Sequence, residues 1–295
     1  MPSPQPTPIP TRDPSRPELR AFWVDAFHPG IKSPQEVDQL VRDLQAAHAN
    51  AVFAQVRKRG DAYYTLSIEP RAAELSKLPD FDPLAELIRK AHAATPPIEV
   101  HAWLVMMPIA RHGETPSDTL HVFTKHGPDA PGDEQWTTRA FNGETIADSN
   151  YFLDPGHPAA AQYLVNIATS LVQHYAVDGI HLDYIRYAGS QWGYNPVSLR
   201  RFLAASGRSA APAPTDAEWQ QWRRRQVTDL VRQIYLESTA LNPALKVSAA
   251  TIAWGAGPTS QAQWLSSRTM TDTFQDWTSW MQEGLLDLAL PMNYD

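Results

Sequence analysis

Residues 177–187 read Val177-Asp178-Gly179-Ile180-His181-Leu182-Asp183-Tyr184-Ile185-Arg186-Tyr187. This stretch joins an apolar strand to a carboxylate, an arginine and two tyrosines, with a glycine near its start. Side chains alternate between the two faces of a strand, so His181 and Asp183 share one face while Ile180 and Leu182 share the other. A buried strand that ends in charged and aromatic residues is typical of the rim of an active site.

The same pattern recurs along the chain, separated by stretches with helical periodicity. Apolar runs of strand length lie at 20–27, 51–57, 98–107, 246–253 and 286–295. Between them, helices are expected from 33, at 82–94, at 158–175, around 219–234 and at 271–282. The first helix has a clear start, because Ser33 is a good N-cap and Pro34 fits the first helical position. Strands that alternate with helices predict a parallel sheet covered by helices.

Polar residues at the strand ends favour a barrel over an open, doubly wound sheet. The strands end at Asp25, Arg57, Asp183 and 293–295, and (β/α)8 barrels build their active sites at the C-terminal ends of strands. No Gly-rich phosphate loop follows the first strand, which argues against the open sheet. We therefore predict an α/β fold, a (β/α)8 TIM barrel. Six strands leave two open edges, so the barrel is expected to be truncated after strand six, with strands seven and eight beyond Asp295.

The chain divides into a tail and one large domain. Residues 1–17 are proline-rich and predict an extended linker or tail. Residues 18–295 are expected to form the barrel catalytic domain. Within it, residues 108–155 are rich in Gly, Pro, Asp and Thr and predict a long loop insertion over the mouth of the fold.

Composition and charge exclude several classes of function. No apolar run reaches the roughly 18 residues of a membrane-spanning helix. Cysteine is absent, which excludes disulfides, thiolate metal sites and cysteine nucleophiles. The net charge of -7 is spread along the chain, so no basic surface for nucleic acid or an anionic membrane is expected.

The sequence also bears on location. No secretory signal is visible. Because a proline-rich linker often follows an export signal or a lipid anchor, we expect a protein of the cell envelope or a secreted protein, exported by a signal not present in this sequence. A cytoplasmic location stays open.

Asp183 is the first candidate for catalysis. An aspartate in an apolar strand loses its hydration and is rarely retained without a partner or a chemical role. A buried ion pair with Arg57 or Arg186 is the alternative explanation. Asp295 is the second catalytic candidate, because hydrolysis of a glycosidic bond generally needs an acid and a second carboxylate.

Other residues near the strand ends are expected to bind substrate. An arginine can hold a carboxylate in a fork of hydrogen bonds, and a tryptophan can stack on a sugar ring. Tyr184 shares the parity of Leu182 and is expected to pack on the outer face. The predicted substrate-binding set is Asp25, Arg57, Trp103, His181, Arg186, Asn293 and Tyr294.

His181 and Asp183 also form an H-x-D pair, which holds a metal in some deacetylases and amidohydrolases. Such a site needs ligands from other strands, such as His101 or Asp25. No other strand offers a second H-x-H or H-x-D pair, so we expect no metal and no cofactor. A metal-dependent amide hydrolase therefore stays as a minor alternative.

Four motifs resemble a known family. They are Glu18-Leu19-Arg20-Ala21-Phe22-Trp23-Val24, Gln55-Val56-Arg57 with Gly60-Asp61-Ala62, Leu153-Asp154-Pro155-Gly156, and 178–187. In this order they resemble the glycosyl-hydrolase-like family 10 of bacteria, also known as domain of unknown function 187, over nearly the whole chain. The resemblance implies a TIM-barrel glycoside hydrolase, often in the bacterial envelope, and for some members a link with peptidoglycan glycan strands.

A more distant resemblance concerns the chemistry. Residues 178–183 are similar to the strand-four signature of family 18 chitinases, D-G-x-D-x-D-x-E, and 292–295 are similar to their M-x-Y-D on strand six. In those enzymes the final Glu is the general acid, and the preceding Asp and the Tyr hold the N-acetyl group of the substrate. The positions of Asp183, Tyr294 and Asp295 match, whereas Ile185 occupies the position of the Glu.

These observations predict a glycoside hydrolase that acts on a bacterial polysaccharide or oligosaccharide, one that contains N-acetylhexosamine, such as peptidoglycan glycan strands. The predicted chemistry is acid/base catalysis by carboxylates at the strand ends. A non-catalytic carbohydrate-binding protein on a degenerate barrel is the main alternative, because Ile185 replaces the expected acid.

Overall fold

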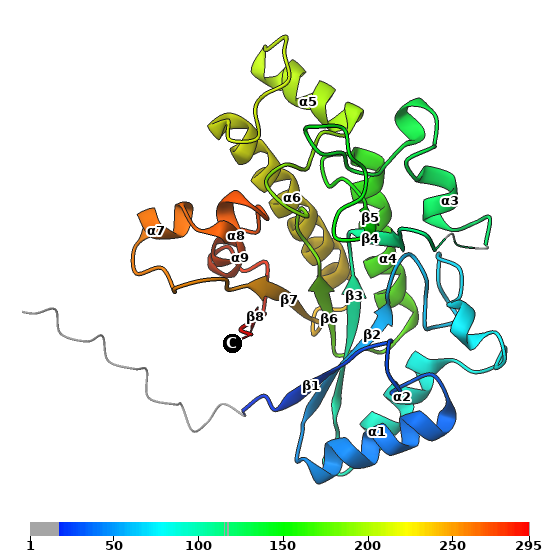
Figure 1. The fold of residues 1–295 in the computed structure, drawn as a ribbon. Helices are drawn as coiled ribbons and strands as arrows, with labels where there is room; N and C mark the ends of the chain where they lie inside the picture. The colour runs from blue at the N-terminus through cyan, green and yellow to red at the C-terminus, as the bar shows by residue number, and fades with distance from the viewer. Residues whose placement is uncertain (1–17, 115, 117, 295) are drawn as a thin grey trace, which may run out of the picture.

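A six-stranded parallel sheet forms the centre of the computed structural model, which describes residues 18–114, 116 and 118–294 (Figure 1). Neighbouring strands pair in the order β1-β2-β3-β6-β7-β8, each parallel to the next. The strands are β1 (Ala21–Val24), β2 (Ala51–Arg57), β3 (Glu99–Val105), β6 (Gly179–Asp183), β7 (Lys246–Ile252) and β8 (Leu288–Met292). Each predicted strand is found, and five of the six are shorter than expected.

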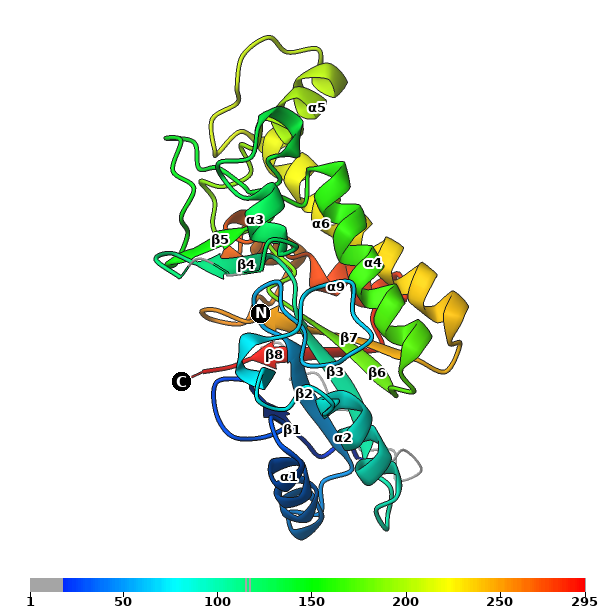
Figure 2. The same cartoon turned by 90° about the vertical axis from the view of Figure 1, so that its right-hand side faces the viewer.

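The sheet is curled into a half-barrel, with β1 and β8 at its two edges (Figures 1 and 2). β2 is buried along its whole length. A strand of this kind is covered by helices on one face and by the barrel interior on the other. The predicted α/β barrel architecture is therefore confirmed as a curled parallel half-barrel. We call the C-terminal ends of its strands the mouth.

Helices cover the outer face of the sheet, where α1 packs on α2 and α4 packs on α6. The longer helices are α1 (Pro34–Ala46), α2 (Pro83–His92), α4 (Pro158–His174), α5 (Pro196–Ser206) and α6 (Ala217–Leu241). α1 starts as predicted, since the Ser33 hydroxyl accepts a hydrogen bond from the Glu36 N–H. No helix among the described residues combines the length and the apolar character needed to cross a membrane.

The two faces of the sheet differ in chemistry. Ile180 and Leu182 join the outer helices in the main buried hydrophobic cluster. The interior instead holds rings whose centroids lie 4.6 to 6.4 Å apart, those of Trp23, Phe53, His101, Trp103 and His181. Gly179 is required by this packing, because a Cβ there would collide with the ring of His101.

The segment 108–155 contains a small sheet of its own. β4 (Pro108–Arg111) pairs antiparallel with β5 (Asn150–Phe152). The short helices α3 (Val122–His126) and η2 (Gly132–Glu134) lie between them in sequence. This segment and α5 lie beyond the C-terminal ends of β3 and β6 in both views (Figures 1 and 2). The predicted tail, residues 1–17, lies outside the described residues.

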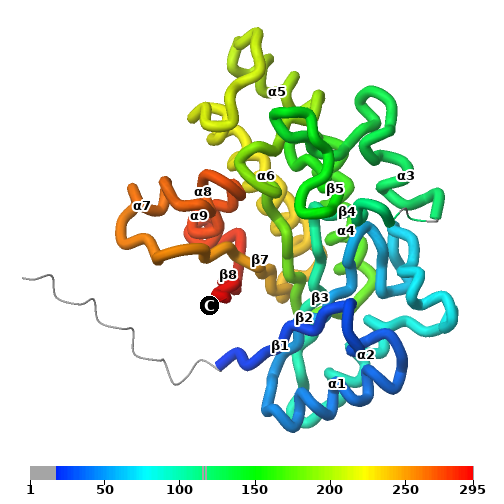
Figure 3. The backbone as a smooth tube through the Cα atoms, in the orientation of Figure 1, coloured from blue at the N-terminus to red at the C-terminus, as the bar shows by residue number. Residues whose placement is uncertain are grey.

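The region after β7 differs most from the predicted helices. Instead of one helix at 271–282, the structure has α7 (Gln261–Leu265), α8 (Arg268–Thr271) and α9 (Trp277–Gln282), a course that the tube in Figure 3 follows. The interruption has a structural reason. The Gln275 amide donates to the Ala250 carbonyl and accepts from the Ile252 N–H, which ties this turn to β7. α5 and the one-turn helix η1 (Ala73–Leu75) were not predicted.

Candidate active site

Asp183 ends β6 at the mouth, and only 6 % of its surface is exposed. Its Oδ2 accepts a hydrogen bond from the Trp103 indole at 3.0 Å, and its Oδ1 accepts one from the Tyr184 N–H at 2.7 Å. Burial raises the pKa of Asp183, because removal from water disfavours the charged form. The Tyr184 N–H, Arg186 and the Trp103 indole oppose this rise in part. Such a carboxyl group is suited to hold a proton and then donate it.

Asp183 lies in a cavity of about 130 Å³. Its lining comes from β2, β3, β6, the loops that follow β1 and β2, and both ends of the segment 108–155. The lining residues are Phe27, Gln55, Lys58, Arg59, Trp103, Val105, Pro108, Asn150, Asp183 and Tyr184. Three of them are aromatic, which gives the cavity flat surfaces of the kind that suit sugar rings. Among the described residues that line it, Asp183 is the one carboxylate.

Tyr184 lines this cavity, although strand alternation predicted it on the outer face. Its φ of 49° lies in the left-handed region, so the regular alternation stops where β6 ends, at Asp183. For a bulky residue this conformation costs on the order of 1 to 3 kcal/mol, and such residues cluster at functional sites. The expected face of Tyr184 was therefore wrong, because the backbone turns before the alternation reaches it.

His181 shares the face of Asp183 but is fully buried below it. Its Nε2 accepts a hydrogen bond from the Trp23 indole at 3.1 Å, and its Nδ1 lies 2.9 Å from the Ser248 hydroxyl. That hydroxyl donates to the Ile180 carbonyl, so the ring carries its proton on Nδ1 and is neutral. Burial lowers the pKa of His181 to about 3, in agreement with the neutral ring. Both ring nitrogens of His181 are therefore engaged in hydrogen bonds within the barrel.

Arg57 ends β2 and is also fully buried. Its Nε and Nη2 bind the two carboxylate oxygens of Glu69 at 2.7 and 2.8 Å, and its Nη1 donates to the carbonyls of Val105 and Met106. Burial acts to lower the pKa of Arg57, but the Glu69 carboxylate outweighs it, and the pKa is raised. The structure thus places Arg57 in a brace that joins β2, β3 and the loop of Glu69.

Arg186 lies at the mouth with 7 % of its surface exposed. Its guanidinium stacks on the Tyr184 ring, 4.5 Å from the centroid, and lies 5.8 Å from that of Trp254. Among the described residues, no hydrogen bond or ion pair joins it to a partner, and its Nε is shielded from solvent. Asp183 likewise forms no ion pair with Arg57 or Arg186 in this part of the chain, so the alternative explanation of Asp183 finds no support.

Asp25 follows β1 and shapes a turn. One carboxylate oxygen accepts the N–H groups of Phe27 and His28 at 2.8 and 2.9 Å, and the His28 ring lies 2.9 Å away. Partial burial acts to raise the pKa of Asp25, but these hydrogen bonds outweigh it, and the pKa is lowered. The structure does not place Asp25 in the lining of the Asp183 cavity.

Asn293 and Tyr294 follow β8 and line a second cavity at the mouth, of about 480 Å³, together with Trp254 and Arg268. Trp254 was not predicted, although its position directly after β7 is the kind of signal that identifies residues at a barrel mouth. Asp295, the predicted second catalytic residue, lies outside the described residues.

No group of three or more His, Asp or Glu side chains in the described part of the chain is placed to hold a metal ion.

Two polar residues of the Asp183 cavity were also missed. Gln55 shares the inward parity of Arg57 on β2, and its Oε1 accepts the Ala26 N–H at 2.8 Å. This inward position in the strand alternation could have identified Gln55 from the sequence. Asn150 comes from β5, and its Oδ1 accepts a hydrogen bond from Arg59 Nε at 3.1 Å. No local pattern identifies Asn150, because the contact joins residues far apart in sequence.

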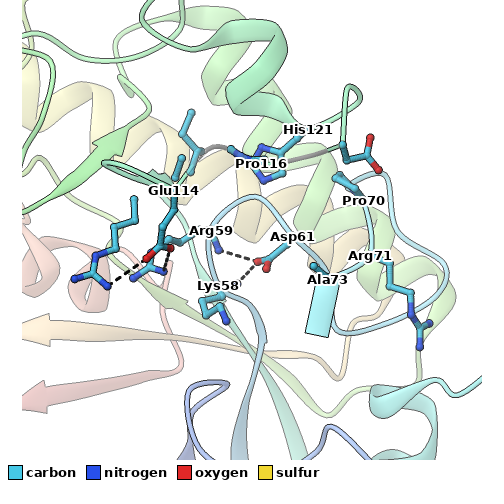
Figure 4. A pocket seen from close by; sticks show the side chains of 13 residues that line it. Lys58, Arg59, Asp61, Pro70, Arg71, Ala73, Glu114, Pro116 and His121 are labelled. Atoms are coloured by element: carbon cyan, nitrogen blue, oxygen red, sulfur yellow. Dashed lines mark hydrogen bonds and ion pairs between the residues drawn. The ribbon is translucent and has the colours of Figure 1, made fainter. Parts of the chain in front are cut away.

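A third cavity, of about 250 Å³, adjoins the Asp183 cavity through Lys58 and Arg59, which line both (Figure 4). Several of its charged groups have partners in the protein. Asp61 accepts the N–H groups of Lys58 and Arg59, and Glu114 lies 3.8 Å from Arg59 and 3.3 Å from Arg111. Arg71 also lines this cavity, and among the described residues it donates only to neutral oxygens, those of Thr65, Leu78 and Phe81.

A family comparison identifies the chain. The model of the family described as Glycosyl hydrolase-like 10 matches residues 18–294. The chain belongs to this family. Membership confirms the resemblance carried by the motifs, and it agrees with an aromatic cavity and a buried carboxyl group at the mouth of a half-barrel.

Curated relatives are glycosyl hydrolases by name. The chain is 28 % identical over 298 residues to glycosyl hydrolase YngK of Bacillus subtilis, which covers 94 % of this chain and 54 % of the relative. It is 24 % identical over 263 residues to glycosyl hydrolase DigH of Escherichia coli K12, which covers 85 % of this chain and 56 % of the relative. The chain thus spans about half the length of the curated relatives it matches.

Solved glycoside hydrolase structures share the fold. The PgaB (BpsB) glycoside hydrolase domain from Bordetella bronchiseptica aligns with a TM-score of 0.61 at 14 % identity, over 94 % of this chain and 74 % of that one. The alpha-L-fucosidase isoenzyme 2 from Paenibacillus thiaminolyticus aligns with a TM-score of 0.56 at 16 % identity, over 78 % of this chain and 32 % of that one. At these identities the likeness shows the fold alone.

Proposed function

We propose that this protein is a glycoside hydrolase that cleaves a bacterial polysaccharide containing N-acetylhexosamine, such as peptidoglycan glycan strands, with Asp183 as general acid. The observation that carries the proposal is a buried carboxyl group with a raised pKa, at a barrel mouth and in an aromatic cavity. Family membership supports the reaction class. The motif resemblance supports the sugar class and a location in the cell envelope or outside the cell.

In the proposed reaction, protonated Asp183 gives its proton to the glycosidic oxygen while the bond from that oxygen to the anomeric carbon breaks. Desolvation keeps the proton on Asp183 until the leaving oxygen takes it. The Trp103 indole holds Oδ2, so the carboxyl group keeps one orientation. We propose Asp295 as the second carboxylate, which stabilises or attacks the oxocarbenium-like centre. Water then supplies the hydroxyl of the new reducing end at the anomeric carbon, and its proton returns to Asp183.

The cavity walls fit a role in orienting the sugar. Phe27, Trp103 and Tyr184 offer ring faces, while Gln55 and Asn150 offer amide groups. Asn150 belongs to β5, so the segment 108–155 contributes to substrate binding in this proposal. The Arg59 hydrogen bond to Asn150 would hold that contribution in place.

The test compares the protein with Asp183→Asn on peptide-free peptidoglycan glycans and on chitin oligosaccharides, with new reducing ends as the readout. We expect the wild type to release reducing ends and Asp183→Asn to lose about 100-fold or more of that activity. Asp178→Asn is the matched control, because Asp178 precedes the same strand at the end opposite the mouth. Cleavage undiminished in Asp183→Asn would remove Asp183 from catalysis.

A carbohydrate-binding protein without hydrolytic activity is the second candidate. One observation favours it: among the described residues that line the Asp183 cavity, no second carboxylate is present, and Ile185 is fully buried. In the same experiment, glycan binding without new reducing ends in the wild type would support this candidate over the hydrolase.

A further inference from the structure

Arg186 contacts one aromatic ring from each of two cavities of the mouth, although it lines neither cavity. Its guanidinium stacks on Tyr184, which lines the Asp183 cavity, and lies near Trp254, which lines the cavity of Asn293 and Tyr294. Stacking on an aromatic ring holds the planar guanidinium in one orientation. A glycan that occupied both cavities would contact Tyr184 and Trp254, the two rings beside this group.

Among the described residues, the guanidinium of Arg186 has no hydrogen-bond or ion-pair partner. Within 18–114, 116 and 118–294, no oxygen accepts a hydrogen bond from it, and its Nε is out of reach of water. Burial lowers the pKa of Arg186, which reflects the free-energy cost of keeping this charge away from solvent. A buried charge without a partner requires an explanation, and a ligand that supplies the missing acceptors is one.

The charges around Arg186 leave it uncompensated. Tyr184, Asp183 and Asp148 act on its guanidinium electrostatically, but none forms an ion pair with it. Asp183 is buried with a raised pKa, which favours its neutral form. Asp148 is exposed, so water and salt screen its charge. The guanidinium therefore keeps a positive charge that can attract an anion.

The other cations at the mouth differ in this respect. Lys58 forms an ion pair with Glu74, and Arg59 lies 3.8 Å from Glu114. Each of these two cations therefore has a carboxylate beside it, which it shares with a second cation, Lys32 or Arg111. Lys58 and Arg59 line the Asp183 cavity and have carboxylate neighbours, whereas Arg186, which contacts the cavity residue Tyr184, forms no ion pair among the described residues.

We propose that Arg186 binds the carboxylate of an acidic sugar, and that the site selects glycans with a carboxylate next to the scissile bond. A guanidinium presents its N–H groups in a fork that matches two carboxylate oxygens. The proposal rests on the proposed glycoside hydrolase function and deepens it by naming an anionic substituent. A neutral glycan would leave the guanidinium without an acceptor.

Binding is measured by isothermal titration calorimetry in the Asp183→Asn background, so that no glycan is consumed. The probes are a glycan with lactyl-ether carboxylates, a glycan with hexuronate carboxylates, and each glycan after reduction of its carboxylates to alcohols. We expect at least one acidic glycan to bind about 10- to 100-fold more tightly than its reduced form, the range of a charge-assisted hydrogen-bonded pair. The preferred acid distinguishes the two sources of the carboxylate.

Arg186→Gln should bring the acidic and reduced forms to within about twofold of each other. Arg186→Lys, which keeps the charge but lacks the fork, should retain part of the preference. Arg200→Gln on α5 is the charge-matched control, because Arg200 is exposed and pairs with Asp133. It should retain the full preference.

Several outcomes would overturn the proposal: equal binding of the acidic and reduced glycans, a preference that survives in Arg186→Gln, or no binding of either acidic glycan. The outcome for Arg186 can be distinguished from the outcome for the proposed hydrolytic function. Arg186-dependent binding without cleavage by the wild type keeps this proposal and removes the hydrolytic function. Equal cleavage of acidic and reduced glycans keeps the hydrolytic function and removes this proposal.

Discussion

Arg57 and Arg186 are both buried arginines near the C-terminal ends of barrel strands, yet their surroundings are opposite. Arg57 is bound by both oxygens of Glu69 and by two carbonyls, with no surface exposed. Arg186 stacks on aromatic rings and has no hydrogen-bond acceptor among the described residues. The pKa of Arg57 is raised by its carboxylate partner in spite of burial, whereas burial lowers that of Arg186.

The difference separates two uses of a buried charge. A guanidinium with its partners in place stabilises the fold and has little left for a ligand. A guanidinium without partners adds a free-energy cost to the folded state, which is retained where a ligand supplies the missing interactions. The sequence predicted substrate binding for both arginines, and the structure distinguishes them by their contacts: the donors of Arg57 are bound by Glu69 and two carbonyls, whereas Arg186 has no hydrogen-bond acceptor among the described residues.

The largest expected effect comes from Arg57→Met. The substitution leaves Glu69 buried without its partner, so we expect the free energy of unfolding to fall by about 3 to 5 kcal/mol in urea denaturation. The double variant Arg57→Met, Glu69→Leu removes both charges and should recover much of that loss. A loss below about 1 kcal/mol in the single variant would contradict the role of Arg57 as a brace.

Asp183→Asn should stabilise the protein while it removes activity. The folded-state pKa of Asp183 lies above its unfolded value, so its contribution to stability is largest below the unfolded pKa and is lost as pH rises through the folded pKa. Unfolding midpoints measured from about pH 4 to about pH 8 should show the wild type losing stability relative to Asp183→Asn as pH rises. A gap that narrows with rising pH would be inconsistent with a buried, protonated carboxyl group.

Arg186→Met should change stability far less than Arg57→Met. No partner is left unpaired, and the methionine fills much of the same volume, so we expect a change within about 1 kcal/mol, with a gain allowed. The two variants are measured side by side by urea denaturation. If Arg186→Met lost as much stability as Arg57→Met, the contrast between the two arginines would be refuted.

The smallest expected effect is a shift in a pH profile. Trp103→Phe removes the indole that favours the charged form of Asp183, so the pKa of Asp183 should rise further. Because the reaction needs protonated Asp183, the alkaline limb of kcat/KM should move to higher pH, by less than about one unit. Trp264→Phe is the matched control, since its indole also donates to a carboxylate, that of Asp276, away from this cavity. An unmoved limb in Trp103→Phe would mean that the indole does not tune the acid.

Much of the wall of the barrel was predictable, because it depends on local periodicity. The alternation in 177–187 placed His181 and Asp183 on one face, and both are found there. The alternation failed at Tyr184, where a left-handed φ turns the chain. The alternation also does not show how deeply a side chain is buried. A substrate contact was therefore expected of His181, but both of its ring nitrogens form hydrogen bonds inside the barrel.

The sequence by itself determined the strand-helix order, the parallel half-barrel and the position of Asp183 at a strand end, because side-chain periodicity and helix caps are local properties. Only the tertiary structure decided which charges have partners. Glu69 reaches Arg57 from a loop, and Asn150 reaches the cavity from β5, through contacts between residues distant in the chain. Burial and pairing are set by such contacts. They bind Arg57 to Glu69, leave Arg186 without an ion pair in the described part of the chain, and raise the pKa of Asp183 by removing it from water.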